Sequence, residues 1–316
     1  MNPFSTPSPA PLQPQTPLDA LQAVIGSLDA LRNGRALYVL LGTFTVTGLL
    51  LGMAQGAFAR GATTWGVVQA GFAFFAAFSG ATAAGLLLMD QAMGRERREV
   101  VDAVADAMAV GHRLLLVLLV AAIVPLLSVL ATAALVMLAR TDVSGALGPW
   151  LFAVTVPVAV VAIGVSGLAL TAVVVPLAGP AIWAGLGVRQ ALGWLAMQVR
   201  RRLLLAAVLM AAVAGLTSVV GALVAAVVMT GARVVALLGV FVGGIDLPPQ
   251  QLMAGLFGHG MRGAGGTAAT PHGSAALIGG GVVFALALVT PALITLRGAC
   301  AAFLVLQRTE QRPLQP

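Results

Sequence analysis

The chain has 316 residues, of which 59% are hydrophobic and 9% charged, whereas about 25% are charged in a typical soluble domain. Its mean hydropathy of +1.02 excludes a soluble globular protein, because no soluble fold hides so much apolar surface, and predicts a protein of the lipid bilayer. All 17 basic residues are arginines. They flank apolar runs, so the positive balance favours membrane orientation over nucleic-acid binding.

The first predicted element is a Pro-rich disordered tail, residues 1–16, which lacks the basic start of a signal peptide. Six apolar stretches follow that are long enough to span a bilayer as helices, since a span needs about 20 residues. They cover roughly residues 36–58, 65–89, 114–138, 150–178, 203–230 and 276–304. Pro125, Pro157 and Pro291 lie inside three of them and predict kinks, which we interpret as packing geometry rather than as gating hinges.

The distribution of arginines predicts the orientation of the chain. Thirteen of the 17 arginines lie on the side of the predicted spans that carries both termini, and four lie on the other side. By the positive-inside rule the first side faces the cytoplasm. Trp65 and Trp150 at outer ends, with Trp183 and Trp194 at inner ends, fit an aromatic belt. Because lysine is absent and Ala, Gly and Val abound, we expect a multi-pass protein of the bacterial inner membrane.

Three arginine junctions indicate an internal repeat. Each odd-numbered span opens with an arginine followed by apolar residues, and the three junctions align at Arg35, Arg113 and Arg202. Each junction follows an amphipathic pattern that predicts a helix at the cytoplasmic interface, with its apolar face toward lipid or toward the bundle. These patterns cover residues 17–31, 99–110 and 188–199.

The sequence therefore predicts an all-α integral membrane protein with six transmembrane helices in three parallel helix-pair repeats, each preceded by a cytoplasmic interfacial amphipathic helix. The repeats cover residues 17–89, 90–178 and 179–307, and a tail of residues 308–316 follows. An outer loop, residues 231–275, separates the two spans of the third repeat. Its part 233–244 is too short to span and predicts an interfacial or re-entrant stretch.

The segment VVVPLAGPAIWAGLGVRQALGWLAMQVRRRLLL (173–205) joins an apolar span ending in proline, a Gly-containing link and an Ala- and Leu-rich amphipathic helix that runs into a basic junction. This pattern resembles bacterial polytopic membrane proteins of unknown function, and it is similar to the membrane domain attached to some bacterial glycerophosphodiester phosphodiesterases. Those sequences usually carry an acidic residue just after the proline, where this chain has Ala178 and Gly179. No counterpart of the phosphodiesterase domain is present, so the resemblance implies no catalytic residue.

Arginines at the cytoplasmic ends of spans are candidate contacts for lipid phosphate, because they meet the head groups there. The candidates are Arg35, Arg113, Arg200, Arg201, Arg202 and Arg297. Arg297 lies deepest, and its side chain either snorkels to the inner surface or binds a phosphate. The predicted spans contain no buried acid, which disfavours proton- or sodium-coupled transport.

We predict no catalytic residue, cofactor or metal. Asp102 and Asp106 share a helical face and could hold a metal with His112, but the neighbouring arginines favour a solvated face. In the outer loop, His259, Met261 and His272 are copper ligands by residue type only. The single cysteine, Cys300, excludes an internal disulfide and a cysteine metal cluster.

These features favour a non-enzymatic scaffold or accessory subunit that contacts membrane lipids, other membrane proteins or a second copy of itself, and that binds no nucleic acid. The alternative is a permease or channel for an apolar or neutral solute, which the prolines within the spans and a threefold axis would support. A membrane lipid enzyme is a third interpretation, and only the acidic segment around Asp90 offers residues for it.

Overall fold

The computed structural model describes residues 22, 25–96, 98–139, 148–242 and 271–310. Within these ranges the chain is helical and contains no strand. Six of the described helices are long and apolar enough to cross a membrane, which confirms the expected class of a helical multi-pass membrane protein. The predicted disordered tail, and the histidines and methionine considered as copper ligands, lie outside the described residues, except that His272 belongs to a described helix.

The first pair of helices is α2 (Gly34–Ala59) and α3 (Thr63–Met93), preceded by a short 3-10 helix, η1 (Gly26–Arg32). The turn between α2 and α3 places Gly61 at φ 76°, a left-handed conformation that favours glycine. Asn33 begins α2, because its side-chain oxygen accepts a hydrogen bond from the Ala36 N–H at 3.2 Å. The two helices pack together along their length.

The second pair is α4 (Val100–Ala139) and α5 (Gly148–Ala169). From α5 the chain continues through a π-helical turn, η3 (Leu170–Val174), into α6 (Val175–Trp183). Pro176 lies at the start of α6, where its missing N–H would break an α-helical hydrogen bond. The wider π turn just before it lets the helical path continue, so the fourth predicted span extends to Trp183.

The third pair is α7 (Val188–Phe241) and α9 (Pro271–Glu310). Helix α7 is kinked at Arg202, whose φ of −141° and ψ of 26° are not helical. The kink separates the predicted interfacial segment from the predicted span. Residues 231–241, which the sequence assigns to the outer loop, are instead the last turns of α7.

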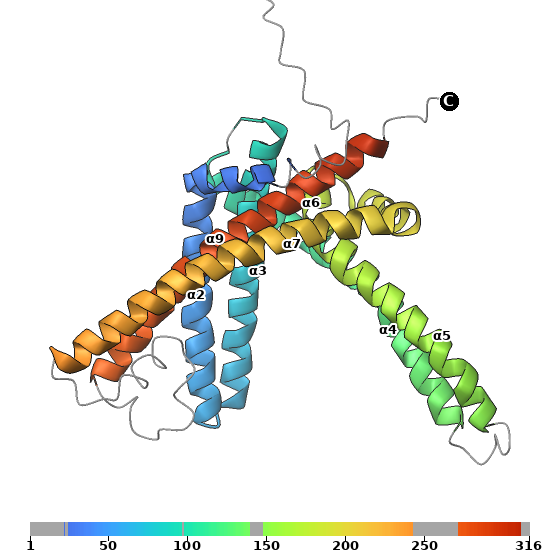
Figure 1. Ribbon diagram of the computed structural model, residues 1–316, viewed down its shortest axis with the longest axis horizontal. Helices are drawn as coiled ribbons and strands as arrows, with labels where there is room; N and C mark the ends of the chain where they lie inside the picture. Colours follow the sequence, from blue (N-terminus) through green and yellow to red (C-terminus); the bar gives the residue numbers. More distant parts are fainter. Residues whose placement is uncertain (1–21, 23–24, 97, 140–147, 243–270, 311–316) are drawn as a thin grey trace, which may run out of the picture.

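The three helix pairs meet at one end of the molecule and diverge at the other, with α7 and α9 running obliquely to α2 and α3 (Figure 1). We call the meeting point the joined end. Its core contains the last turns of α3 and α9, most of α6 and the first parts of α4 and α7. A second cluster joins η1 and the start of α2 to α3 and α9.

Trp183 is the centre of the larger cluster. Its ring fills the space above two glycines: a Cβ on Gly85 would lie 2.4 Å from the ring, and one on Gly179 would lie 2.8 Å away. The side chain is 6% exposed. The expectation that Trp183 belongs to an interfacial aromatic belt is therefore wrong, because missing side chains on α3 and α6 make a buried site for it. Trp65 and Trp150 are exposed, as a belt position requires.

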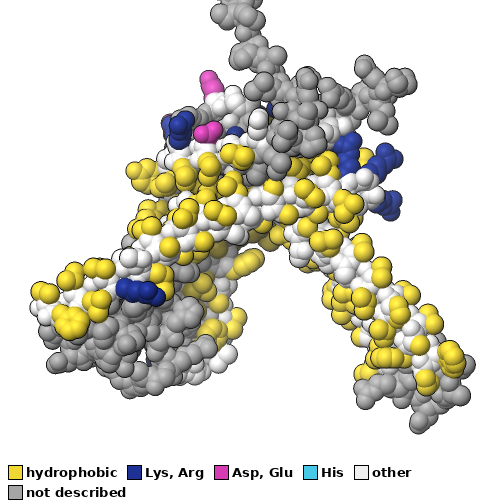
Figure 2. Space-filling model, in the orientation of Figure 1, with side chains coloured by type: hydrophobic (Ala, Val, Ile, Leu, Met, Phe, Trp, Pro, Cys, Tyr) yellow, Lys and Arg dark blue, Asp and Glu magenta, His cyan; other side chains and the backbone are white. Residues whose placement is uncertain are grey.

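Away from the joined end the helices present apolar side chains outward (Figure 2). On α4 and α5, Leu119, Leu127 and Val160 are 65%, 58% and 67% exposed. In water such a surface would be unstable, and lipid is the solvent that it fits.

The three arginine junctions differ in structure. The first has a break at Asn33, the second lies within the unbroken α4, and the third is the kink of α7. The predicted segment 99–110 exposes its apolar residues Val101, Val104 and Met108. The predicted segment 188–199 instead packs its apolar face, including Leu195, into the core.

Candidate functional site

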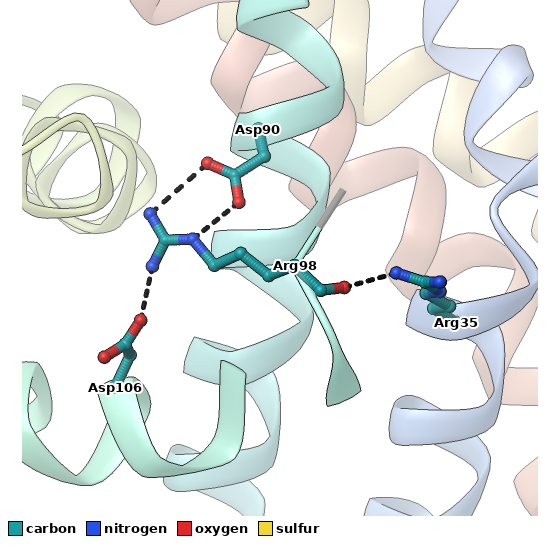
Figure 3. A network of polar contacts seen from close by, with 4 residues as sticks. All are labelled: Arg35, Asp90, Arg98 and Asp106. Atoms are coloured by element: carbon teal, nitrogen blue, oxygen red, sulfur yellow. Dashed lines mark hydrogen bonds and ion pairs between the residues drawn. The ribbon is translucent and has the colours of Figure 1, made fainter. Parts of the chain in front are cut away.

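A cluster of charged residues at the joined end is centred on Arg98, in the link between α3 and α4 (Figure 3). The Arg98 guanidinium group contacts Asp90 of α3, with 2.7 Å between Nε and Oδ2, and Asp106 of α4, with 2.6 Å between Nη1 and Oδ2. Arg35 of α2 donates a hydrogen bond from Nη1 to the Arg98 carbonyl oxygen at 2.6 Å. We call these four residues the Arg98 cluster.

The local sequence explains why Arg98 turns back onto α3. Gly94 ends α3 in the left-handed region, at φ 66°, where glycine avoids a steric penalty. The Arg95 N–H then donates to the Asp90 carbonyl oxygen at 2.9 Å, which closes the end of the helix. The chain reverses there, so Arg98 reaches the side chain of Asp90 and the first turns of α4.

Electrostatics give the cluster a structural role. Asp90 is 2% exposed, and a buried carboxylate without a cation would be strongly unfavourable. Arg98 supplies that cation and also binds the partly exposed Asp106. Asp102 is exposed, and the half-exposed Asp106 is neutralised by Arg98, one of the neighbouring arginines. No group of three metal-ligating side chains occurs within the described residues.

Two of the six candidate phosphate contacts bind other parts of the protein. Arg35 binds the Arg98 carbonyl, as described above. Arg202 donates from Nη1 to the Thr309 hydroxyl oxygen and, at 3.2 Å, from Nη2 to the Thr309 carbonyl oxygen. A cation at the carboxyl end of a helix also interacts favourably with the helix dipole. Arg202 thus fastens the kink of α7 to the end of α9.

The other four candidates remain open to a ligand to different degrees. Arg113, Arg200 and Arg201 are exposed. Arg297 is partly exposed, but its Nε is buried and has no hydrogen-bond partner. Lipid contact stays a proposal for all six residues. The exposed Arg200 and Arg201 lie next to each other just before the kink.

Sequence reasoning missed polar contacts that join the start of α2, the end of α3 and η1. The Asn33 amide nitrogen donates to the Gln91 side-chain oxygen at 2.9 Å, and Gln91 reaches the Asp29 carbonyl oxygen at 3.4 Å. The sequence places Arg98 among the arginines that orient the chain and neutralise the acidic segment 89–108, but no local pattern singles out Asp90 and Asp106 as its partners.

No family model, no curated protein and no solved structure matches this chain.

Proposed function

We propose that this protein is a non-enzymatic scaffold or accessory subunit of the bacterial inner membrane, with the joined end and both termini in the cytoplasm. The observation that carries the proposal is the arrangement of the helix pairs, which pack together at one end and expose apolar side chains elsewhere. Such faces within a bilayer are available to lipids and to the helices of other membrane proteins.

The second hairpin offers a free apolar surface for a partner. Most of the span in α4 is exposed, although α4 and α5 pack against each other. Small residues on α5, including Gly164, Ser166 and Gly167, permit close approach of another helix. Asp90, Arg98 and Asp106 at the joined end pair with one another, as structural groups do, which supports a non-enzymatic role.

A crosslinking experiment tests this proposal. In the test variant a photoreactive amino acid replaces Leu119 on α4, which is 65% exposed. In the matched control it replaces Val117, two residues earlier, which is fully buried. We expect irradiation of native membranes to give a discrete adduct with another membrane protein, or with a second copy, from position 119 and not from position 117.

Adducts with lipid alone at position 119 would contradict the scaffold function. Reconstitution of the purified protein into lipid vesicles tests the permease alternative, because a permease transports its solute without a partner protein. Saturable uptake of a neutral solute by vesicles that contain only this protein would favour the permease alternative instead.

A further inference from the structure

A basic surface lies where α7 bends. Arg200 and Arg201 are exposed just before the kink, and Arg308 is exposed near the end of α9. Because Arg202 binds Thr309, the residue after Arg308, the structure brings together the parts of α7 and α9 that carry these arginines. We call Arg200, Arg201 and Arg308 the α7–α9 basic patch. Figure 2 shows basic side chains gathered beside the first part of α7.

The charge of this patch is not neutralised by the described side chains. Among the side chains that the structure describes, none forms an ion pair with these three arginines, whereas Arg98 is held by two carboxylates. Exposed positive charges that lie together attract an anionic partner.

Apolar side chains follow the patch directly. Leu204 is 79% exposed and Val208 is 62% exposed, and both lie in the part of α7 that is apolar enough to span a membrane. A basic surface that continues into an aliphatic one matches a phospholipid, which has phosphate at one end and acyl chains at the other. A nucleic acid or a soluble acidic protein would use only the basic half.

We propose that the α7–α9 basic patch binds the phosphate groups of an anionic phospholipid, with an acyl chain lying along Leu204 and Val208. Three guanidinium groups in one place favour a head group with two phosphates, such as that of cardiolipin, over one with a single phosphate. This site deepens the lipid contact of the proposed function and rests on its membrane placement. It does not depend on any protein partner.

The test is a lipid titration of the purified full-length protein, followed by native mass spectrometry. We expect cardiolipin to bind more tightly than phosphatidylglycerol, and phosphatidylethanolamine to bind weakly. The variant R200Q/R201Q/R308Q should bind cardiolipin about tenfold or more weakly. The control, R32Q/R95Q, removes two exposed arginines that are predicted to face the same leaflet and are not candidate lipid contacts. It should change binding less than about twofold.

Equal losses in both variants, or no loss in the first, would overturn the site. A photoactivatable cardiolipin with its reactive group in an acyl chain tests the unaltered protein and so avoids any folding defect of a variant. It should label the α7 peptide that contains Leu204 and Val208, and labelling confined to other helices would overturn the proposal. Saturable binding of labelled RNA that is lost in R200Q/R201Q/R308Q would also overturn it, because the patch would then serve a nucleic acid.

Discussion

Asp90 and Arg98 are an ion pair across the joined end, and each stabilises the position of the other. The Asp90 side chain is 3% exposed, whereas that of Arg98 is 30% exposed, so one partner is buried and the other still reaches solvent. Arg98 also binds Asp106, and Arg35 binds the Arg98 carbonyl. The cluster therefore links α2, α3 and α4 through one residue of an irregular link.

The change Arg98→Gln should lower the free energy of unfolding by about 2–3 kcal/mol, because it leaves the buried Asp90 carboxylate without a cation. Thermal unfolding of the purified protein in detergent measures the loss. The control Arg95→Gln removes an exposed arginine three residues away and should change stability by less than about 0.5 kcal/mol.

The double variant D90N/R98Q should be no less stable than R98Q, since it contains no unpaired charge. If the free energy of unfolding of D90N/R98Q were lower than that of R98Q by about as much as R98Q is lower than the unchanged protein, the two residues would act independently. The ion-pair interpretation would then be wrong.

The roles of single arginines could be predicted only in part from sequence. Their position at the ends of spans was readable, because a basic residue beside an apolar run marks an interface. Their partners were not, since Arg35 binds a residue 63 positions away and Arg202 one 107 positions away. Such contacts depend on how the helix pairs pack, which no local pattern contains.

At the scale of elements, apolar length predicted the spans well. The second span was expected at 65–89 and is α3, Thr63–Met93. The ends of the helices were harder to predict, because backbone hydrogen bonds extend a helix beyond its apolar part into the polar residues on either side. Thus α4 begins at Val100 without a break at Arg113, and α7 continues to Phe241. The threefold repeat and the amphipathic interfacial helices stay predictions.

The contact between α3 and α6 is so close that one added methyl group should destabilise the protein. Gly85→Ala would place a Cβ within 2.4 Å of the Trp183 ring, so we expect a loss of about 1–3 kcal/mol from overpacking. Gly71→Ala, on the same helix with nothing within 4 Å of its Cβ, is the matched control and should not destabilise the protein.

Chemical or thermal unfolding in detergent compares the two variants. The double variant G85A/W183L should recover part of the loss, because the smaller side chain makes room. Equal stability of G85A and G71A would show that Trp183 does not hold these helices together.

At the scale of the molecule, the proposed orientation has a direct test. Cys300 is the single cysteine and is fully buried. In a Cys300→Ala background, one introduced cysteine reports on which side of the membrane its position lies. Arg60→Cys, in the exposed turn between α2 and α3, should react with an impermeant thiol reagent in spheroplasts. Arg95→Cys, in the exposed link between α3 and α4, should react only after the membrane is opened, because the positive-inside rule places it in the cytoplasm. The reverse pattern would invert the topology.

The oblique course of α7 has a geometric consequence for the surrounding bilayer. From Arg202 to Phe241 the helix is about 58 Å long at 1.5 Å per residue, almost twice the roughly 30 Å of a hydrocarbon layer. An upright helix of this length would carry its exposed apolar residues, such as Phe241, out into water. A slanted one keeps more of them in the acyl region and touches more annular lipid per unit of depth. In a thicker or thinner bilayer, the tilt of α7 can change so that its apolar residues stay out of water.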